Sequence, residues 1–166
     1  MRNPVVVDTN VAVVANGLAA GVNADCVLAC IRHLSLIRRE HCLLVDGSGL
    51  IVEEYRRNLS PSGQPGPGDA FFKWLWDNQV TEDVCKQVLI TPTHGDDRGF
   101  EEFPEDMELS RFDRDDRKFV AVALASEAQP PIVNASDTDW WHFREALTRN
   151  GLRLKFLCPE LMTGEG

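Results

Sequence analysis

The sequence predicts an α/β protein with three layers, α/β/α, around a central and mostly parallel sheet. Short runs of aliphatic and β-branched residues, such as Val5–Val7 and Ile132–Val133, alternate with longer segments whose apolar residues recur at helical spacing. Several of the short runs end directly in polar or acidic residues, as strands of an open sheet do at a ligand site. Strands that alternate with helices are typical of parallel sheets with helical crossovers.

Each expected element has its own local signals. Asn16-Gly17 and Asn150-Gly151 are typical helix ends, Asn23 is a typical N-cap, and Pro130-Pro131 stops the helix before it. The Gly/Pro-rich stretch 61–68 and most of 92–108 are expected to be loops. We expect strands at 4–7, 42–45, 84–90, 132–134 and 152–157, and helices at 10–15, 23–39, 50–59, 69–79, 114–128 and 138–149.

The composition narrows the class of protein. The chain has 166 residues, which we interpret as one domain at 1–160 and a tail at 161–166. No apolar run approaches the roughly 20 residues of a membrane span, and no signal peptide is visible, so we expect a cytoplasmic protein. The net charge of −9 argues against a protein that binds nucleic acid simply by being basic.

The five cysteines are expected to be reduced thiols, most of them buried. Cys26 and Cys30 share a helical face, with His33 nearby, but these three residues do not complete the ligand set of a zinc site. Packing of the helix explains their positions more simply.

Acidic residues stand beside four of the expected element ends. Asp8 follows the first strand, and Asp137 and Asp139 follow the strand 132–134. Asp116 continues the inward apolar stripe of its helix, whereas Asp113 and Asp115 point further outward and are suited to capping. Capping alone would also explain Asp116, Asp137 or Asp139, because acidic side chains favour the first turn of a helix.

The third helix offers two glutamates. Glu53 is spaced to pair with Arg56 and Arg57 on the surface, so Glu54, which also has Arg57 in range, is the preferred candidate of the two for a buried cluster. If one acid from each of the four segments met at one edge of the sheet, the cluster would be costly without a cation. Mg²⁺ or Mn²⁺ accepts such all-oxygen ligands, and these ions support phosphoryl chemistry.

Four segments together resemble the motifs of PIN-domain ribonucleases, the family that includes VapC-type toxins. In order, they are Val-Val-Val-Asp8-Thr9-Asn10, the helix Ile51–Leu59, the helix start Asp115–Leu124, and Ile132–Trp140. Each motif is weak alone, and the order and spacing carry the resemblance, which spans nearly the whole chain. The loop 61–68 and the acidic stretch 95–108 make the chain longer than the compact toxins.

The resemblance implies a Mg²⁺- or Mn²⁺-dependent endoribonuclease that hydrolyses single-stranded RNA. It further implies a possible role as the toxin of a toxin–antitoxin pair, with an antitoxin partner and self-association as a homodimer. Its acidic cluster would be Asp8, Glu54, Asp116 and Asp137, with Glu53 and Asp139 as alternatives. Thr9, Asn10 and Ser136 would support the cluster through hydrogen bonds.

Several further hypotheses stay open at this point. Basic residues near the acidic motifs are candidates for guiding RNA, or for pairing with the abundant acids: Arg56, Arg57, Arg111, Arg114, Arg117 and Lys118. The aromatic segment 71–76 is expected in the core or in a dimer interface rather than as a base-stacking platform. An inactive PIN-fold scaffold that binds RNA or protein is the main alternative function. A phospho-acceptor receiver using Asp8 or Asp46, with Lys155, is a weaker one.

Overall fold

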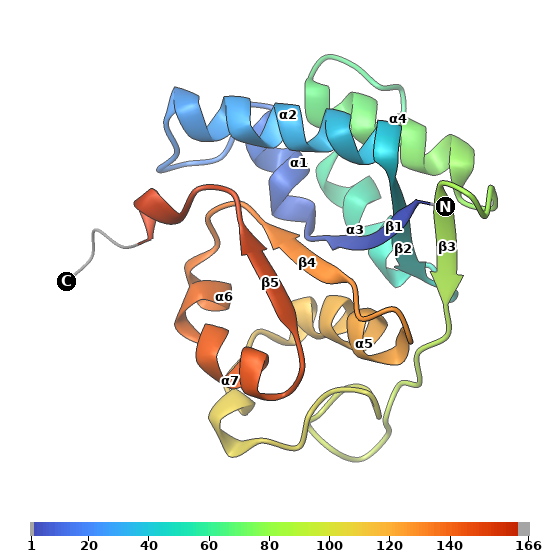
Figure 1. Cartoon of the computed structure of the whole chain (residues 1–166), viewed down its shortest axis with the longest axis vertical. Coiled ribbons are helices and arrows are strands. Elements are labelled where there is room, and N and C mark those ends of the chain that lie inside the picture. The colour runs from blue at the N-terminus through green and yellow to red at the C-terminus, as the bar shows by residue number, and fades with distance from the viewer. Residues whose placement is uncertain (1, 163–166) are drawn as a thin grey trace.

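A five-stranded sheet, parallel throughout, forms the centre of the molecule in the computed structural model, which describes residues 2–162 (Figure 1). The strands lie in the order β3-β2-β1-β4-β5. This sheet confirms the predicted fold class. The strands are β1 (Asn3–Val7), β2 (His41–Asp46), β3 (Cys85–Val88), β4 (Pro131–Asn134) and β5 (Arg153–Phe156).

Helices cover the sheet in two layers (Figure 1). One layer contains α1, α2 and α4, which pack on one another, and α5 contacts β1, β2 and β4 from the other side, where α6 and α7 also lie. The helices are α1 (Thr9–Ala15), α2 (Ala24–Glu40), α3 (Leu50–Asn58), α4 (Pro67–Asn78), α5 (Arg117–Ala125), α6 (Thr138–His142) and α7 (Arg144–Arg149). Short 3-10 turns occur at η1 (Met107–Leu109), η2 (Arg114–Asp116) and η3 (Pro159–Leu161).

The prediction of a single helix over 138–149 was wrong. The chain bends at Phe143, between α6 and α7. Phe143 packs edge-on against the buried Phe112, with 5.6 Å between ring centroids. No proline or glycine marks this bend, so local sequence signals could not reveal it.

The pairing of β1 with β4 brings the ends of two distant segments together. Val7 lies opposite Val133, and the backbone N–H of Asp8 donates to the carbonyl of Val133 at 3.0 Å. On the other side of β1, the buried Tyr55 hydroxyl of α3 donates to the carbonyl of Val7 at 2.6 Å. These contacts place the residues after β1, the residues after β4 and one side of α3 at a common edge.

The aromatic helix α4 contributes mainly to the core. Phe71, Phe72 and Leu75 are fully buried, and Phe72 stacks on Tyr55 with ring centroids 6.1 Å apart. Trp76 is 44% exposed and Trp74 is half-buried, so these two rings are the aromatic side chains of α4 that reach solvent.

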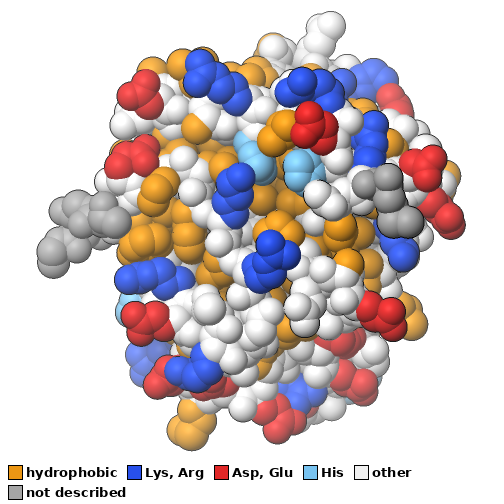
Figure 2. All heavy atoms as spheres, in the orientation of Figure 1, with side chains coloured by type: hydrophobic (Ala, Val, Ile, Leu, Met, Phe, Trp, Pro, Cys, Tyr) orange, Lys and Arg blue, Asp and Glu red, His pale blue; other side chains and the backbone are white. Residues whose placement is uncertain are grey.

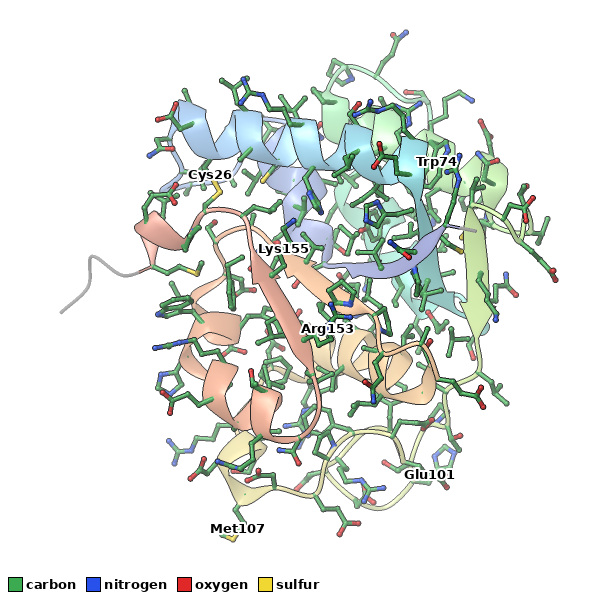
Figure 3. The ribbon with its side chains drawn as sticks, viewed as in Figure 1. Cys26, Trp74, Glu101, Met107, Arg153 and Lys155 are labelled. Carbon is green, nitrogen blue, oxygen red and sulfur yellow. A yellow bond between two sulfur atoms is a disulfide. The ribbon has the colours of Figure 1, made fainter. Side chains whose placement is uncertain are left out.

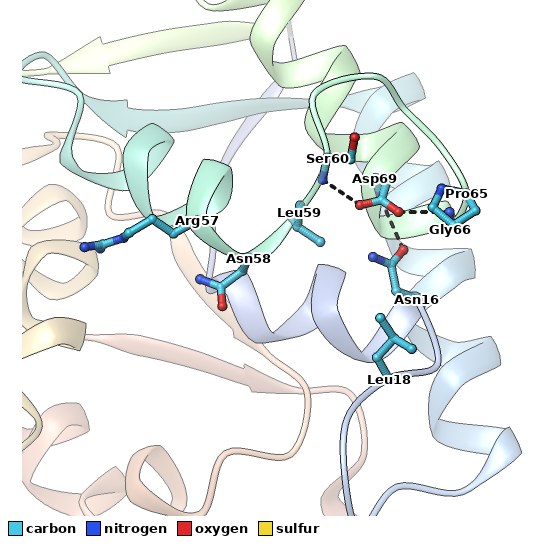
Figure 4. Close-up of a pocket in the computed structure, with 9 residues that line it drawn as sticks. All are labelled: Asn16, Leu18, Arg57, Asn58, Leu59, Ser60, Pro65, Gly66 and Asp69. Carbon is cyan, nitrogen blue, oxygen red and sulfur yellow. Dashed lines mark hydrogen bonds between the residues drawn. The ribbon is translucent and has the colours of Figure 1, made fainter.

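The start of α4 is tied to the end of α1 by side chains that cap it (Figure 4). The side-chain Oδ1 of Asn16 accepts from the backbone N–H groups of Gly68 and Asp69, at 2.7 and 3.2 Å. The Asp69 carboxylate in turn accepts from the backbone of Ser60 and Gly66, at 2.8 and 2.9 Å. Four backbone donors near a helix start are thus satisfied, and α4 is held directly against α1.

The expectation that all five cysteines are reduced was wrong for two of them. Cys26, at the start of α2, forms a disulfide with Cys158, which follows β5 (Figure 3). The two residues are 132 positions apart in sequence, and the fold brings their Cα atoms to 5.5 Å, a normal separation for a disulfide. Cys30, Cys42 and Cys85 are free and buried, as expected.

The disulfide bears on the expected location, because disulfides are uncommon in cytosolic proteins. A cytoplasmic location stays a prediction. Within residues 2–162, none of the helices has both the length and the apolar character needed to cross a membrane. Of the expected tail 161–166, residues 163–166 lie outside the described part of the chain.

Arg117 organises the long acidic segment that precedes α5. Its guanidinium is buried and donates to backbone carbonyls of Asp97, Phe112 and Leu109, at 2.8 to 3.2 Å. It also lies over the Phe103 ring, 4.5 Å from the centroid. Arg117 therefore ties together both ends of the segment 97–112.

Replacing Arg117 with lysine should destabilise the protein by about 2 kcal/mol, because one ammonium cannot reproduce a fork of donors to several carbonyls. Arg114→Lys is the matched control, since Arg114 is exposed and pairs only with Asp97. Urea unfolding measures both variants. Equal stability of the two would show that the buried fork does not hold the segment.

Candidate metal centre

Three aspartates meet at the carboxyl edge of the sheet. Asp8 follows β1, Asp137 follows β4, and Asp116 immediately precedes α5. One carboxylate oxygen of each lies within 4.8 Å of the others. Asp8 and Asp116 are buried and Asp137 is half-buried. The structure thus brings together three of the four acids predicted to form the cluster.

Asp8 is oriented by two neighbours. Its Oδ1 accepts from the backbone N–H of Asn10 at 3.0 Å, which caps α1, and its Oδ2 accepts from the side-chain amide of Asn134 at 3.0 Å. Sequence reasoning missed Asn134, although it is the last residue of β4 and its position at a strand end was a usable signal. Asn10 supports the same edge, because its Oδ1 accepts from the backbone N–H of Ala135 at 3.2 Å.

The other two predicted supports behave differently. The Thr9 hydroxyl donates to Glu54 and not to an aspartate of the cluster. The Ser136 side chain makes no hydrogen bond among the described residues, and its supporting role stays a prediction. Asn10 therefore supports the aspartates of the predicted cluster, and Thr9 supports its glutamate.

Helix capping does not account for Asp116. It stands at the N-cap position of α5, but its side chain accepts no capping hydrogen bond. Asp113 performs that task one turn earlier, accepting from the backbone N–H of Asp115 at 2.9 Å. Asp116 is therefore a buried carboxylate whose side chain has no hydrogen-bonded or ion-paired partner within residues 2–162.

Asp137 both caps a helix and joins the aspartate group, the two roles that the sequence left open. Its Oδ1 accepts from the backbone N–H of Asp139 at 2.9 Å, which caps α6, while the carboxylate still lies with Asp8 and Asp116. Asp139 accepts from the backbone N–H of Asp113 at 3.1 Å and joins Asp113 and Asp116 in a second, more exposed group. Asp137 is thus the one that faces Asp8.

The two glutamates of α3 separate as predicted. Glu53 forms an exposed ion pair with Arg56. The charge of Glu54 contributes to the raised pKa of Asp8 and of Asp116. Its Oε1, however, is 2.7 Å from Nζ of Lys118, and its Oε2 accepts from Thr9. Glu54 therefore lies beside the three aspartates and is not one of the grouped ligands.

The cluster carries an electrostatic cost. Burial, reinforced by repulsion between neighbouring carboxylates, raises the pKa of Asp8 to about 7 and that of Asp116 to about 9. Burial also raises the pKa of Asp137. The indole Nε1 of the buried Trp140 has no hydrogen-bond partner among the described residues. It nevertheless lies near enough to Asp8 to oppose part of the rise in the pKa of that carboxyl.

This donor set fits a hard divalent cation. Three carboxylates from separate segments supply only oxygen ligands, and no buried sulfur or imidazole competes within the group. A bound cation would also offset the repulsion between the carboxylates. The Asp46 carboxylate, by contrast, caps α3 through the N–H groups of Leu50 and Ile51, and Lys155 is exposed on β5. These two placements give the phospho-acceptor hypothesis no support.

Most of the basic residues near the acidic motifs are already engaged. Arg117 and Lys118 are buried, and Arg56 and Arg114 form ion pairs. Within residues 2–162, Arg57 and Arg111 are exposed and have no hydrogen-bonded or ion-paired partner. On the face shown in Figure 2, Lys and Arg side chains are interspersed with Asp and Glu. Of the six basic residues considered for guiding RNA, Arg57 and Arg111 are therefore the remaining candidates.

Searches of protein-family models, of curated proteins and of solved structures found no match to this chain.

Proposed function

We propose that this protein is a divalent-cation-dependent endoribonuclease of the PIN type that cleaves single-stranded RNA. The observation that carries the proposal is the convergence of Asp8, Asp116 and Asp137 at the carboxyl edge of a parallel sheet, in the order that the motifs predict. Three clustered, partly buried acids do not help a fold to be stable, whereas metal-dependent hydrolysis of a phosphodiester requires such a cluster. The antitoxin partner and the homodimer stay predictions of the resemblance.

The chain's own groups define what the site can do. Asp8, Asp116 and Asp137 would hold Mg²⁺ or Mn²⁺, and such an ion polarises a phosphate and supplies hydroxide from bound water. Asn134 and the backbone of Asn10 fix the orientation of Asp8. Arg57 and Arg111, exposed and unengaged within the described chain, are the candidates to contact phosphates of the RNA backbone.

The test is cleavage of a fluorophore-labelled single-stranded RNA by the purified full chain. We expect cleavage with Mn²⁺ or Mg²⁺, none in excess chelator, and a loss of at least 1,000-fold in rate for Asp8→Asn, since one carboxylate ligand is removed. Asp25→Asn is the matched control, because Asp25 is an exposed aspartate in the first turn of α2 and is not in either acidic group.

Cleavage in excess chelator, or at the wild-type rate by Asp8→Asn, would contradict the proposal. Mn²⁺ binding without cleavage of any RNA would favour the inactive scaffold instead. Double-stranded RNA and single-stranded DNA of the same sequence test the substrate class.

A further inference from the structure

Lys118 places a buried positive charge inside the acidic site. Its Nζ lies 2.7 Å from Oε1 of Glu54 and donates to the backbone carbonyl of Asp115. The side chains of Lys118 and Glu54 are only 9% and 13% exposed. A buried ammonium is costly unless it is paired, so Lys118 depends on Glu54.

The same contacts engage both carboxylate oxygens of Glu54. One carboxylate oxygen accepts from Lys118 and the other from the Thr9 hydroxyl. Thr9 is the first residue of α1, next to Asp8, and Lys118 follows Asp116 by two residues. Glu54 is therefore held by side chains that flank two of the clustered aspartates, while its own oxygens stay outside their group.

We propose that Lys118 is a built-in cation that holds Glu54 beside the metal ion as a positioning residue, so that only the aspartates bind the ion. The inference rests on the proposed function and deepens it. Asp8, Asp116, Asp137 and Glu54 carry four negative charges when ionised, and Lys118 neutralises one of them, leaving three for a divalent ion. Lys118 thereby limits how much negative charge the site offers to metal.

Removing Lys118 should free Glu54 to act as an extra ligand. We expect Lys118→Met to bind Mn²⁺ at least fivefold more tightly than wild type, measured by calorimetric titration of the metal-free full chain. The double variant Lys118→Met/Glu54→Gln removes both charges and should bind Mn²⁺ within threefold of wild type, because neither residue is a ligand.

Lys73→Met is the matched control for the change in net charge. Like Lys118, Lys73 pairs with a carboxylate, but this pair is exposed: Nζ of Lys73 lies 2.6 Å from Oδ2 of Asp77, one turn further along α4. Its loss should leave Mn²⁺ affinity within twofold of wild type. Melting temperatures in chelator establish that each variant is folded, and if Lys118→Met alone fails to fold, the charge-balanced double variant still decides the question.

A loss of tenfold or more in the double variant would show that Glu54 is a metal ligand and would overturn the inference while leaving the proposed function intact. An unchanged or weaker affinity in folded Lys118→Met would overturn it as well. Absence of Mn²⁺ binding by the wild type at millimolar concentration would contradict the proposed function itself, and the inference with it.

Discussion

Gly68→Ala is expected to lower the stability of the protein by about 3 kcal/mol, or roughly 10 °C in melting temperature, through overpacking. A Cβ on Gly68 would lie 1.9 Å from the carbonyl oxygen of Ala12 and 2.7 Å from its carbonyl carbon. Both obstacles are backbone atoms of α1 and no rotamer change can relieve them. Helices α1 and α4 must therefore separate, which also weakens the bond from Gly68 N–H to Asn16.

The same shift should reach the candidate metal centre. Helix α1 begins directly after Asp8, and its first turn contains Thr9 and Asn10. We therefore expect Gly68→Ala to weaken Mn²⁺ binding as well as to lower the melting temperature, as measured by thermal unfolding and calorimetric titration.

Gly47→Ala is the control for this glycine. A Cβ there would meet only the carbonyl oxygen of Val88, at an ordinary 3.9 Å. Its melting temperature should stay within about 2 °C of wild type, because a glycine in an accessible conformation tolerates alanine. Equal melting temperatures for the two variants would show that the α1–α4 contact relaxes without cost.

The sequence was sufficient for the fold class because its signals are local. The run Val5–Val7, the caps at Asn16 and Asn23, and Pro130-Pro131 each constrain only a few residues, and together they define the alternation of strands and helices. Helical phase was equally informative for Asp116, which proved buried, and for Glu53, which proved to be a surface partner of Arg56.

What the sequence could not show are pairings between residues far apart in the chain. Lys118 and Glu54 are 64 positions apart, Asp8 and Asn134 are 126 apart, and Cys26 and Cys158 are 132 apart. The last two pairs follow from the order of the strands, which places β4 beside β1 and β5 beside β4, and the first from the packing of α3 near α5. A single sequence without that order gives no reason to choose Lys118 over the other basic residues.

Asp116→Asn is expected to stabilise the metal-free protein while abolishing its response to Mn²⁺. Asp116 is only 9% exposed, and its ionised form is disfavoured by burial and by the neighbouring carboxylates. Asparagine keeps the shape and removes the charge, so at pH 8 we expect a gain on the order of 2 kcal/mol, or roughly 5 °C in melting temperature.

The gain should depend on pH in a definite direction. The pKa of Asp116 is raised in the folded protein, so between an ordinary carboxyl value near 4 and its folded value of about 9 the unfolded chain binds fewer protons than the folded one. Wild-type stability therefore falls as pH rises through this window, and the advantage of Asp116→Asn grows from near zero at pH 4 to its full value near pH 9. Asp25→Asn, at an exposed helix start, should show no such rise with pH.

Mn²⁺ should reverse the order of the two proteins. At 100 times its dissociation constant, a ligand that binds only the folded state adds about 2.7 kcal/mol of stability, which wild type gains and Asp116→Asn does not. Thermal unfolding at pH 8 with chelator and with Mn²⁺ measures both effects in one series. If Asp116→Asn lowered the melting temperature in chelator at every pH, Asp116 would be a structural residue. That result would contradict the assignment of the three aspartates as a metal site.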